Sequence, residues 1–322
     1  MLRYASVALA LMALSCATAT GPSSGSNSVL SGNWETIAEL LHPVRAPAVA
    51  TDGQRIYVFG GSAGASPRTA YTQVFDPVTG AWTLAAAAPE PHEWGMAVFA
   101  DGVVHVLGGV RDGTAATDAH WIYDPDADAW STDVAIPTPA AGSAAALLDG
   151  RIILAGGIDA PSAHSDNVHL FDLASNSWAQ GTPTPVERIN WQAAVIDGLF
   201  YVAGGLSPGQ VTSSALLRYD LTQNQWSSLP AMPTQNEGYA AAVVSGLYCV
   251  LGGRVAPPSG SFSPPKDDFI CYDPDAQQWR IGPRLPSAAE EMGAAAIDGV
   301  LYAIGGRVSF GGVTGAVYRI GN

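Results

Sequence analysis

Three residue patterns repeat along the chain in the same steps, and this repetition constrains the fold more than any other feature. The first pattern is a Gly-Gly pair and the second is a tryptophan. The third is an aromatic residue followed by Asp, seven residues before the tryptophan of its repeat. The Gly-Gly pairs begin at Gly60, Gly108, Gly156, Gly204, Gly252 and Gly305, and the tryptophans are Trp34, Trp82, Trp130, Trp178, Trp226 and Trp279, with steps of 48, 48, 48, 48 and 53 residues in both series. A period near 50 residues with these markers predicts a β-propeller.

Each repeat is predicted to form four strands, as the fourth repeat illustrates. A strand rich in Ala and Val, Ala193–Ile196, ends at the hairpin signal Asp197-Gly198, and the next strand, Leu199–Ala203, runs into Gly-Gly. A third strand ends at the aromatic-Asp pair, and a short turn leads to the fourth strand with Trp226. Small side chains suit the first strand because blades crowd together at the axis, whereas the tryptophan fills the wider outer spacing.

The two ends of the chain predict the number of blades. The last repeat stops at Asn322, four residues after Tyr318, and therefore lacks its tryptophan. Trp34 has no strands before it. We expect residues of about 32–42 to complete a sixth blade with residues 289–322, which removes the open sheet edge. The predicted fold is an all-β, six-bladed propeller over residues 32–322, whose sixth blade is closed by the N-terminal strand.

These markers resemble those of the kelch family over residues 32–322, including the prolines after the tryptophan, such as Pro230 and Pro233 after Trp226. Kelch propellers include intracellular protein-binding domains, secreted oxidases, nitrile-forming specifier proteins and a periplasmic sialic-acid epimerase of bacteria. The resemblance therefore implies a kelch-type propeller of the exported bacterial kind, with a weaker likeness to that epimerase. The fold alone does not imply one function.

The N-terminal segment is typical of an export signal. Residues 1–19 combine a basic start at Arg3 with a short apolar run. Ala17-Thr18-Ala19 is a cleavage site for soluble release, whereas Leu14-Ser15-Cys16 resembles a bacterial lipobox that would leave Cys16 lipidated. Both alternatives place the protein in the bacterial periplasm or on the envelope as a lipoprotein. Residues 20–31 are rich in Gly, Ser, Thr and Asn and are predicted to form a flexible linker.

The charge composition excludes some classes of partner. The chain has 14 Lys and Arg against 28 Asp and Glu, a net charge of −14, and only one of the basic residues is a lysine. Such a chain does not offer the basic face that nucleic acid requires. We expect no nucleic-acid partner, contact with a membrane only through the lipid anchor, and a monomer.

Polar residues concentrate on two sets of loops that share one face of the predicted propeller. One set leads from the outer strand of a blade to the inner strand of the next, and the other follows Gly-Gly. Arg45, Trp94, Asn190 and Glu291 all lie eight residues before the Gly of the inner turn, where the other repeats have Gly142 and Gly238. The predicted ligand-binding residues are Arg45, Arg188, Trp94, Asn190, Trp191, Asn236, Tyr239, Arg111, Arg254 and Arg307.

Two functions are compatible with this face. The first is an exported binding module for a protein, peptide or glycan. The alternative, implied by the family resemblance, is a cofactor-free sugar epimerase or mutarotase. In that enzyme Glu237, Glu93 and Glu291 would transfer protons. Arg45 and Arg188 would hold a substrate carboxylate, and Trp94, Trp191 and Tyr239 would stack on a sugar face.

No cofactor or metal site is predicted. The six histidines, His42, His92, His105, His120, His164 and His169, are scattered over the first three repeats without the spacing of metal ligands. Cys249 and Cys271 fall in predicted strands of the fifth blade, either as core residues or as a disulfide. An insertion at residues 256–266 makes the loop of that blade the longest, as a lid, a rim or tolerated slack.

Overall fold

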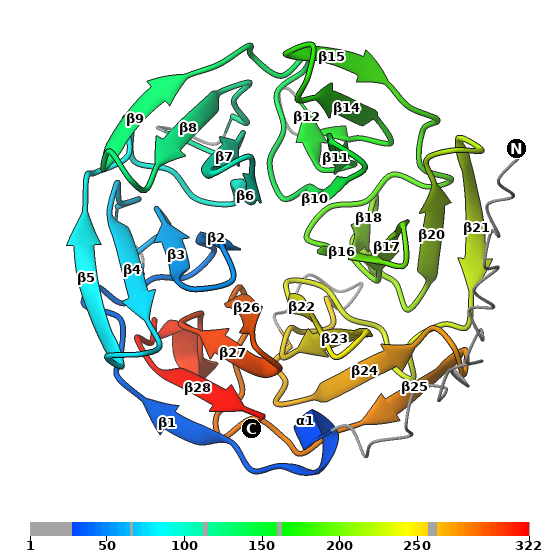
Figure 1. Cartoon of the computed structure of the whole chain (residues 1–322). Helices are drawn as coiled ribbons and strands as arrows, with labels where there is room; N and C mark the ends of the chain where they lie inside the picture. The colour runs from blue at the N-terminus through cyan, green and yellow to red at the C-terminus, as the bar shows by residue number, and fades with distance from the viewer. Residues whose placement is uncertain (1–27, 65–66, 112–114, 160–162, 257–262, 322) are drawn as a thin grey trace, which may run out of the picture.

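The computed structural model describes residues 28–64, 67–111, 115–159, 163–256 and 263–321, and these residues form six four-stranded antiparallel sheets around a central axis (Figure 1). The predicted six-bladed, all-β fold is confirmed. Residues 1–27, with the predicted export signal and Cys16, lie outside the described residues. In the part that is described, no helix has the length and apolar character needed to cross a membrane.

Each blade is a sheet that runs outward from the axis, and in blades 1 to 5 the strands follow one another in chain order. Blade 1 consists of β2 (Ala48–Thr51), β3 (Ile56–Phe59), β4 (Thr72–Asp76) and β5 (Ala81–Ala85). Blade 2 consists of β6 (Met96–Ala100), β7 (Val103–Leu107), β8 (His120–Asp124) and β9 (Ala129–Thr132). Blade 3 consists of β10 (Ala144–Leu148), β11 (Arg151–Ala155), β14 (Val168–Asp172) and β15 (Ser177–Gln180).

The second half of the chain repeats this arrangement. Blade 4 consists of β16 (Ala193–Ile196), β17 (Leu199–Ala203), β20 (Leu216–Asp220) and β21 (Gln225–Leu229). Blade 5 consists of β22 (Ala240–Val244), β23 (Leu247–Leu251), β24 (Phe269–Asp273) and β25 (Gln278–Ile281). Blade 6 consists of β26 (Gly293–Ile297), β27 (Val300–Ile304), β28 (Val317–Ile320) and β1 (Glu35–Ile37).

Short elements decorate the blades. The loops after Gly-Gly carry two hairpins, β12 (Ile158–Asp159) with β13 (Ala163–His164) and β18 (Leu206–Ser207) with β19 (Val211–Thr212). A 3₁₀ turn, η1 (Ser309–Gly311), lies in the blade 6 loop. Helix α1 (Ser28–Ser31) precedes β1, and its Val29 is buried in the core. Residues 28–31, which belong to the segment predicted as a linker, are therefore part of the folded structure.

The burial of the strands follows their distance from the axis. The second strand of a blade is covered on both faces, and β23 is buried at all five positions, as its unbroken apolar sequence requires. The outermost strand is half exposed and alternates, as β5 does around Trp82. The core therefore lies between neighbouring blades, and the loops are left free at the two ends of the propeller.

The sixth blade is closed by the two ends of the chain. Strand β1 pairs antiparallel with β28, in register from Glu35 opposite Arg319 to Ile37 opposite Val317. The pairing is visible where the first and last coloured segments lie side by side (Figure 1). An ion pair of 2.8 Å between Arg319 and Glu35 reinforces it. The predicted completion of blade 6 by the N-terminal strand is confirmed.

A ring of tryptophans holds the outer edges of the blades together. The indole Nε1 of each repeat tryptophan donates a hydrogen bond to a backbone carbonyl in the segment that leaves the preceding blade. Trp82 donates to Ala38, Trp130 to Ala86, Trp178 to Val134, Trp226 to Thr182, Trp279 to Pro230 and Trp34 to Pro283, at 2.8–3.0 Å. We call these six contacts the tryptophan ring. Its last member, from Trp34, connects the N-terminal segment to the end of blade 5.

A second ring, made of backbone, surrounds the axis at the loop face. Six residues, one before the inner strand of each blade, each donate their N–H to the carbonyl of the equivalent residue in the preceding blade, at 2.6–3.0 Å. All six have a positive φ between 49° and 61°. We call them the mouth ring; they are Ala46, Trp94, Gly142, Asn190, Gly238 and Glu291.

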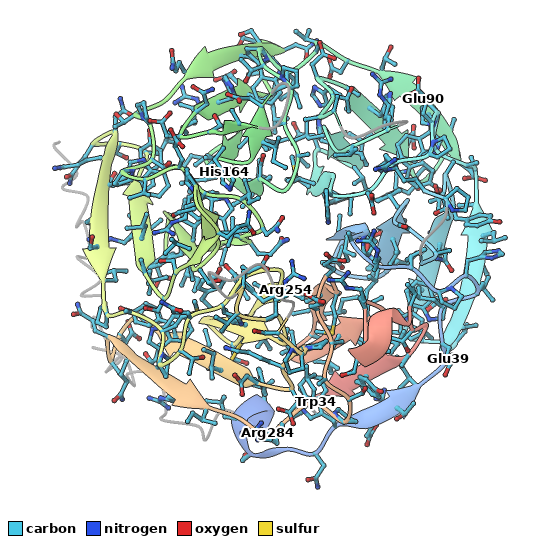
Figure 2. The ribbon with its side chains drawn as sticks, turned by 180° about the vertical axis from the view of Figure 1, so that it is seen from behind. Trp34, Glu39, Glu90, His164, Arg254 and Arg284 are labelled. Atoms are coloured by element: carbon cyan, nitrogen blue, oxygen red, sulfur yellow. A yellow bond between two sulfur atoms is a disulfide. The ribbon has the colours of Figure 1, made fainter. Side chains whose placement is uncertain are left out.

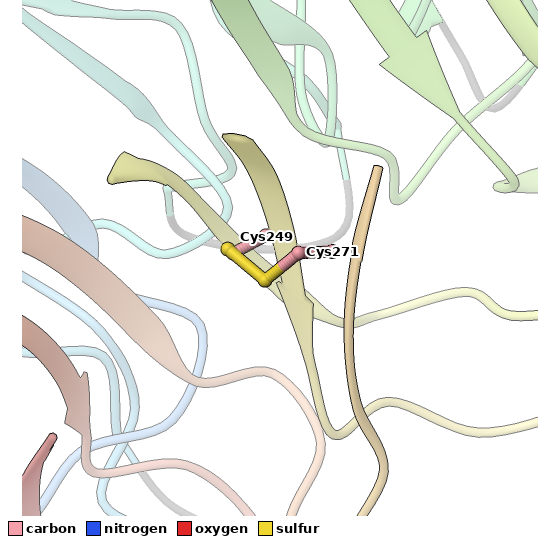
Figure 3. The surroundings of a disulfide bond; sticks show 2 residues. All are labelled: Cys249 and Cys271. Carbon is pink, nitrogen blue, oxygen red and sulfur yellow. A yellow bond between two sulfur atoms is a disulfide. The ribbon is translucent and has the colours of Figure 1, made fainter. Parts of the chain in front are cut away.

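Cys249 and Cys271 form a disulfide inside blade 5 (Figure 3). They lie directly opposite each other on β23 and β24, and both are fully buried. The pairing resolves the two alternatives that the sequence left open for these cysteines.

Candidate functional site

The side chains of the mouth ring alternate in size around the axis. Blades 2, 4 and 6 contribute Trp94, Asn190 and Glu291, whereas the residues between them are Ala46, Gly142 and Gly238. The prediction that Trp94, Asn190 and Glu291 occupy equivalent places is therefore confirmed by their positions in the ring. Three chemically different groups, an aromatic face, an amide and a carboxylate, stand around one opening with small residues between them.

Arg45 does not belong to this ring, which corrects the predicted register of blade 1. The Asp-Gly pair of that blade ends at Gly53, seven residues before Gly60, whereas the pair in blade 2 ends six residues before its Gly-Gly. A count of eight residues back from the Gly of the inner turn therefore reaches Arg45 in blade 1, one residue before the true ring member, Ala46. Counting from Gly-Gly finds the ring, because each member precedes the first Gly of its pair by 14 residues.

Arg45 lies one residue before the ring and begins a network of ion pairs. Its guanidinium lies 2.7 Å from Glu291 and 3.2 Å from Glu93, and Glu93 also lies 3.0 Å from Arg68. The same guanidinium stands 6.0 Å from the ring centre of Trp94, within the range of a cation–π contact. Blades 1, 2 and 6 are linked here through side chains that are far apart in sequence.

The network continues across blades 6, 5 and 4. Arg307 lies 2.6 Å from Glu290 and 4.0 Å from Glu291, and Arg254 contacts both Glu290, at 2.9 Å, and Glu237. The amide of Asn190 donates a 3.0 Å hydrogen bond to Glu237. Figure 2 shows Arg254 among the side chains that border the central opening, whereas Glu90 lies near the rim. Four arginines and four glutamates thus alternate along one arc of the mouth.

The pKa shifts of this arc follow from burial opposed by opposite charges. Burial lowers the pKa of Arg45, but Glu291 and Glu93 outweigh it, and the net shift is upward. The same balance, with Glu237 and Glu290, raises the pKa of Arg254. Burial raises the pKa of Glu290 in spite of the neighbouring Arg254 and Arg307. Glu290 is not among the predicted site residues, yet its carboxyl lies in the network and its ionised form is disfavoured by burial.

Arg188 lies apart from this network. It is 9 % exposed, and its guanidinium donates to the hydroxyl of Ser207 on β18 at 2.5 Å. Burial lowers its pKa, with no carboxylate acting against the shift. Arg188 precedes ring residue Asn190 by two positions, and it does not line the cavity at the mouth. The structure therefore places Arg188 against Ser207 of the blade 4 loop, and not in the ion-pair network of Arg45.

Three predicted contact residues are parts of the core. Trp191 is 1 % exposed and donates to the carbonyl of Ala155, and Tyr239 is equally buried, with its hydroxyl on Ala203. Asn236 is 2 % exposed and donates to the carbonyl of Gly252. Trp191 and Tyr239 are too deeply buried to offer a ring face for stacking on a ligand, although Tyr239 borders the mouth cavity.

Arg111 is also outside the mouth. Its guanidinium pairs with Glu90 at 2.6 Å, and both side chains are exposed to solvent. Exposed pairs of this kind contribute little to stability. The structure thus brings Arg45, Arg254, Arg307, Trp94, Asn190, Glu93, Glu237 and Glu291 together, and leaves Arg188, Arg111, Trp191, Asn236 and Tyr239 in other surroundings.

The central cavities are small. The one at the mouth ring has a volume of about 40 Å³, and the channel below it, lined mostly by Ala, Gly and Met, has about 110 Å³. A wider recess of about 390 Å³ lies between the loops of blades 5 and 6. It is lined by Ser263, Pro264, Pro265, Glu290, Arg307, Val308, Ser309 and Gly311. The recess and the mouth share the ion-pair network through Glu290 and Arg307.

Two histidines that are scattered in the sequence meet in blade 2. His105 Nδ1 lies 2.9 Å from His120 Nε2, and a carboxylate oxygen of Asp133 lies within 4.8 Å of a ring nitrogen of each histidine. These histidines lack the spacing of metal ligands in the sequence, but strand pairing places residues 15 apart on the same face of one sheet.

Comparison with protein families agrees with this geometry. The family model that describes the kelch-repeats domain of KLHDC2, KLHL20 and DRC7 matches residues 34–184 and again 132–306. The chain belongs to the kelch-repeat family. Among solved kelch-like folds, the structure described as that of YjhT superposes with a TM-score of 0.76 and 17 % sequence identity, and the match covers 87 % of this chain and 95 % of that one. That likeness concerns the fold. No curated protein matches the sequence.

Proposed function

We propose that this kelch propeller is a binding module whose partner sits on the loop face, over the mouth ring. The observation that carries the proposal is the alternation of Trp94, Asn190 and Glu291 with small residues around the ring. An aromatic face, an amide and a carboxylate offer stacking and both kinds of hydrogen bonding. The small residues between them leave room for an entering group.

Backbone strain supports this assignment. Trp94 and Asn190 both have a φ of 56°, and Glu291 has a φ of 53°. A left-handed conformation costs a residue with a Cβ about 1–2 kcal/mol, whereas glycine adopts it freely. Gly142 and Gly238 form the same backbone hydrogen bonds, so the ring does not need side chains at these positions. A strained backbone at residues whose backbone hydrogen bonds glycine could equally form is typical of functional sites.

The small central cavities favour a large partner over a small molecule. Pockets that enclose a small ligand usually have volumes of roughly 300–1,000 Å³. A mouth of about 40 Å³ admits only the tip of a group, such as one side chain or one sugar substituent. The bulk of a protein, peptide or glycan would then rest on the surrounding loops and over the recess beside blade 6.

We also propose that this module acts outside the cytoplasm. The signal-like segment at residues 1–19 supports export, and the Cys249–Cys271 disulfide is typical of oxidising compartments. Lipidation of Cys16 would anchor it to the bacterial envelope. Cys16→Ala should then abolish fatty-acid labelling and release the protein from the membrane fraction. Unchanged soluble secretion would support cleavage after Ala19 instead.

Glycine variants test the binding proposal without disturbing the ring. Trp94→Gly and Asn190→Gly reproduce what blades 3 and 5 already carry, so we expect both to fold. The wild-type protein and both variants are tested on a glycan array and in pull-downs from the native envelope. The control is Val78→Ala, a change at a residue that is 92 % exposed. We expect a captured ligand to be lost with either glycine variant and kept with Val78→Ala. Binding that survives both glycine variants would move the site away from the mouth.

A second function, a cofactor-free sugar epimerase or mutarotase, is favoured by one observation. Burial raises the pKa of Glu290 beside Arg254 and Arg307, and Glu290 lines the 390 Å³ recess. A carboxyl whose pKa is raised and that lies beside cations is a candidate for proton transfer. Anomer exchange of acidic and neutral sugars, followed by NMR, should then fall by about 10²–10⁴-fold in Glu290→Gln. No exchange above buffer in the wild type would reject the enzyme and leave the binding module.

A further inference from the structure

Blade 2 departs from the other five blades at three positions that meet in space. Because the blades are repeats, each residue of one blade has a counterpart in every other. His105 corresponds to Tyr57, Ile153, Tyr201, Cys249 and Tyr302; His120 to Thr72, Val168, Leu216, Phe269 and Val317; and Asp133 to Ala85, Gly181, Leu229, Gly282 and Ile37. None of these counterparts is a His, Asp or Glu, so the fold itself does not call for these groups.

The three side chains converge although they come from separate strands. His105 lies on β7, His120 on β8, and Asp133 directly after β9. Their potential ligand atoms all lie within 4.8 Å of one another. Both histidines are buried, at 4 % and 2 % exposure, whereas Asp133 is partly exposed. The group therefore has a buried base of two imidazoles and a carboxylate toward solvent.

We propose that His105 Nδ1, His120 Nε2 and a carboxylate oxygen of Asp133 bind a divalent transition-metal ion, with zinc as the best match. Two imidazoles and one carboxylate form a ligand set that suits zinc, with a water molecule in the fourth place. The metal would join three strands of blade 2 on the side that packs against Phe171 and Trp178 of blade 3.

The distances suit such an ion. Two nitrogens bound to zinc at 2.0–2.1 Å in tetrahedral geometry lie about 3.3 Å apart. The two ring nitrogens now lie 2.9 Å apart, so an opening of a few tenths of an ångström suffices. The proton that His105 Nδ1 donates to His120 Nε2 would move to Nε2 of His105. Both imidazoles then stay neutral, and His105 Nδ1 and His120 Nε2 each turn a lone pair toward the ion.

The surroundings of His120 match those of a metal ligand. Its second nitrogen, Nδ1, lies 3.0 Å from the carbonyl of Val134, to which it donates when Nε2 carries the lone pair. Metal-bound histidines usually donate their other N–H to a carbonyl or carboxylate, which fixes the ring and the tautomer.

Variants copied from other blades separate metal binding from folding. His105→Tyr takes the residue of blades 1, 4 and 6, His120→Val that of blades 3 and 6, and Asp133→Ala that of blade 1. The matched control is His169→Leu, which removes an equally buried histidine outside the group and copies Leu217 of blade 4. All proteins are prepared without a histidine tag, treated with a chelator and titrated with zinc alone.

We expect the wild type to bind one zinc ion per chain and to melt roughly 5 °C higher at saturating zinc. Cobalt in its place should give the visible absorption of a four-coordinate site. His105→Tyr and His120→Val should lose the binding, the melting shift and the cobalt spectrum, Asp133→Ala should bind at least roughly 10-fold more weakly, and His169→Leu should behave as the wild type.

Two outcomes would overturn the proposal. One is a wild-type protein that takes up no stoichiometric zinc, which would leave a buried histidine–histidine hydrogen bond. The other is zinc binding that persists in His105→Tyr and His120→Val, which would place the metal elsewhere. Melting curves in chelator show whether each variant is folded, and the exposed change Asp133→Ala gives a reading even if a core variant is not.

Discussion

Two closed rings hold the propeller together, and they use different parts of the chain. The tryptophan ring at the rim consists of six side-chain contacts, in which the same residue type donates to a backbone carbonyl in every blade. The mouth ring at the axis consists of six backbone hydrogen bonds, and its residues are Ala, Trp, Gly, Asn, Gly and Glu. One ring demands a particular side chain, whereas the other accepts any side chain that tolerates a positive φ.

This difference separates stability from function within one repeat. A contact through an indole N–H cannot be replaced by another side chain without losing the hydrogen bond and the packing, so the rim stays uniform. A contact through the backbone leaves the side chain free, so the mouth can vary from blade to blade while the scaffold stays rigid. The mouth ring is therefore where we expect recognition, and the tryptophan ring is where we expect the largest losses of stability.

Deletion of residues 32–41 should have the largest effect. It removes Trp34 and β1, which opens the tryptophan ring and exposes the edge of β28. We expect insoluble protein or the loss of cooperative thermal unfolding, measured by circular dichroism. A truncated chain that melts like the full chain would contradict the role of the N-terminal strand in closure.

Trp82→Ala should have the next largest effect. The indole of Trp82 is 7 % exposed and packs against Phe75, with a centroid distance of 5.1 Å. Loss of a buried aromatic side chain costs about 3–5 kcal/mol of unfolding free energy. Chemical denaturation measures this loss of free energy. Trp82→Phe keeps an aromatic side chain but loses the indole N–H, and the missing hydrogen bond itself should cost about 0.5–1.5 kcal/mol. Equal losses in both variants would mean that the hydrogen bond carries the effect.

Acid should lower the free energy of unfolding through the buried His92. His92 is fully buried, and burial lowers its pKa, so the folded protein keeps it neutral where the unfolded chain takes up a proton. Stability is therefore complete above about pH 6.5, the usual pKa, and falls as the pH drops toward the folded value. The slope from this one group is at most about 1.4 kcal/mol per pH unit.

His92→Asn isolates that slope, since Asn236 occupies the equivalent place in blade 5. Denaturation midpoints at several pH values below neutrality should fall less steeply in the variant than in the wild type. Parallel slopes would show that His92 is already protonated in the folded protein at those pH values.

Trp94→Gly should have the smallest effect on stability. It removes a tryptophan, as Trp82→Ala does, but from a position where the backbone forms the contact and glycine relieves the positive φ. We expect a change within about 1 kcal/mol in either direction, because relief of strain opposes the loss of packing and the added freedom of the unfolded chain. A loss as large as that of Trp82→Ala would erase the distinction between the rings.

Prediction of the candidate site from sequence succeeded where the repeat itself carried the information. Trp94, Asn190 and Glu291 are equivalent in sequence and meet in the ring. It failed for the predicted stacking of Trp191 and Tyr239, which directly follow a ring residue and are almost fully buried. Sequence places both kinds of residue on the same loop, and one step along the backbone decides between the mouth and the interior.

The repeat alone determined the architecture, because six copies of the same markers can bury their apolar faces only by stacking around an axis. The number of blades, the closure by Trp34 and the tryptophan ring all follow from that periodicity. The tertiary structure decided what the non-repeating residues do. Arg45 meets Glu291 across 246 residues, and His105 meets His120 through strand pairing. Such contacts are not periodic, because they depend on the particular side chains that strand pairing within a blade, or packing between blades, brings face to face.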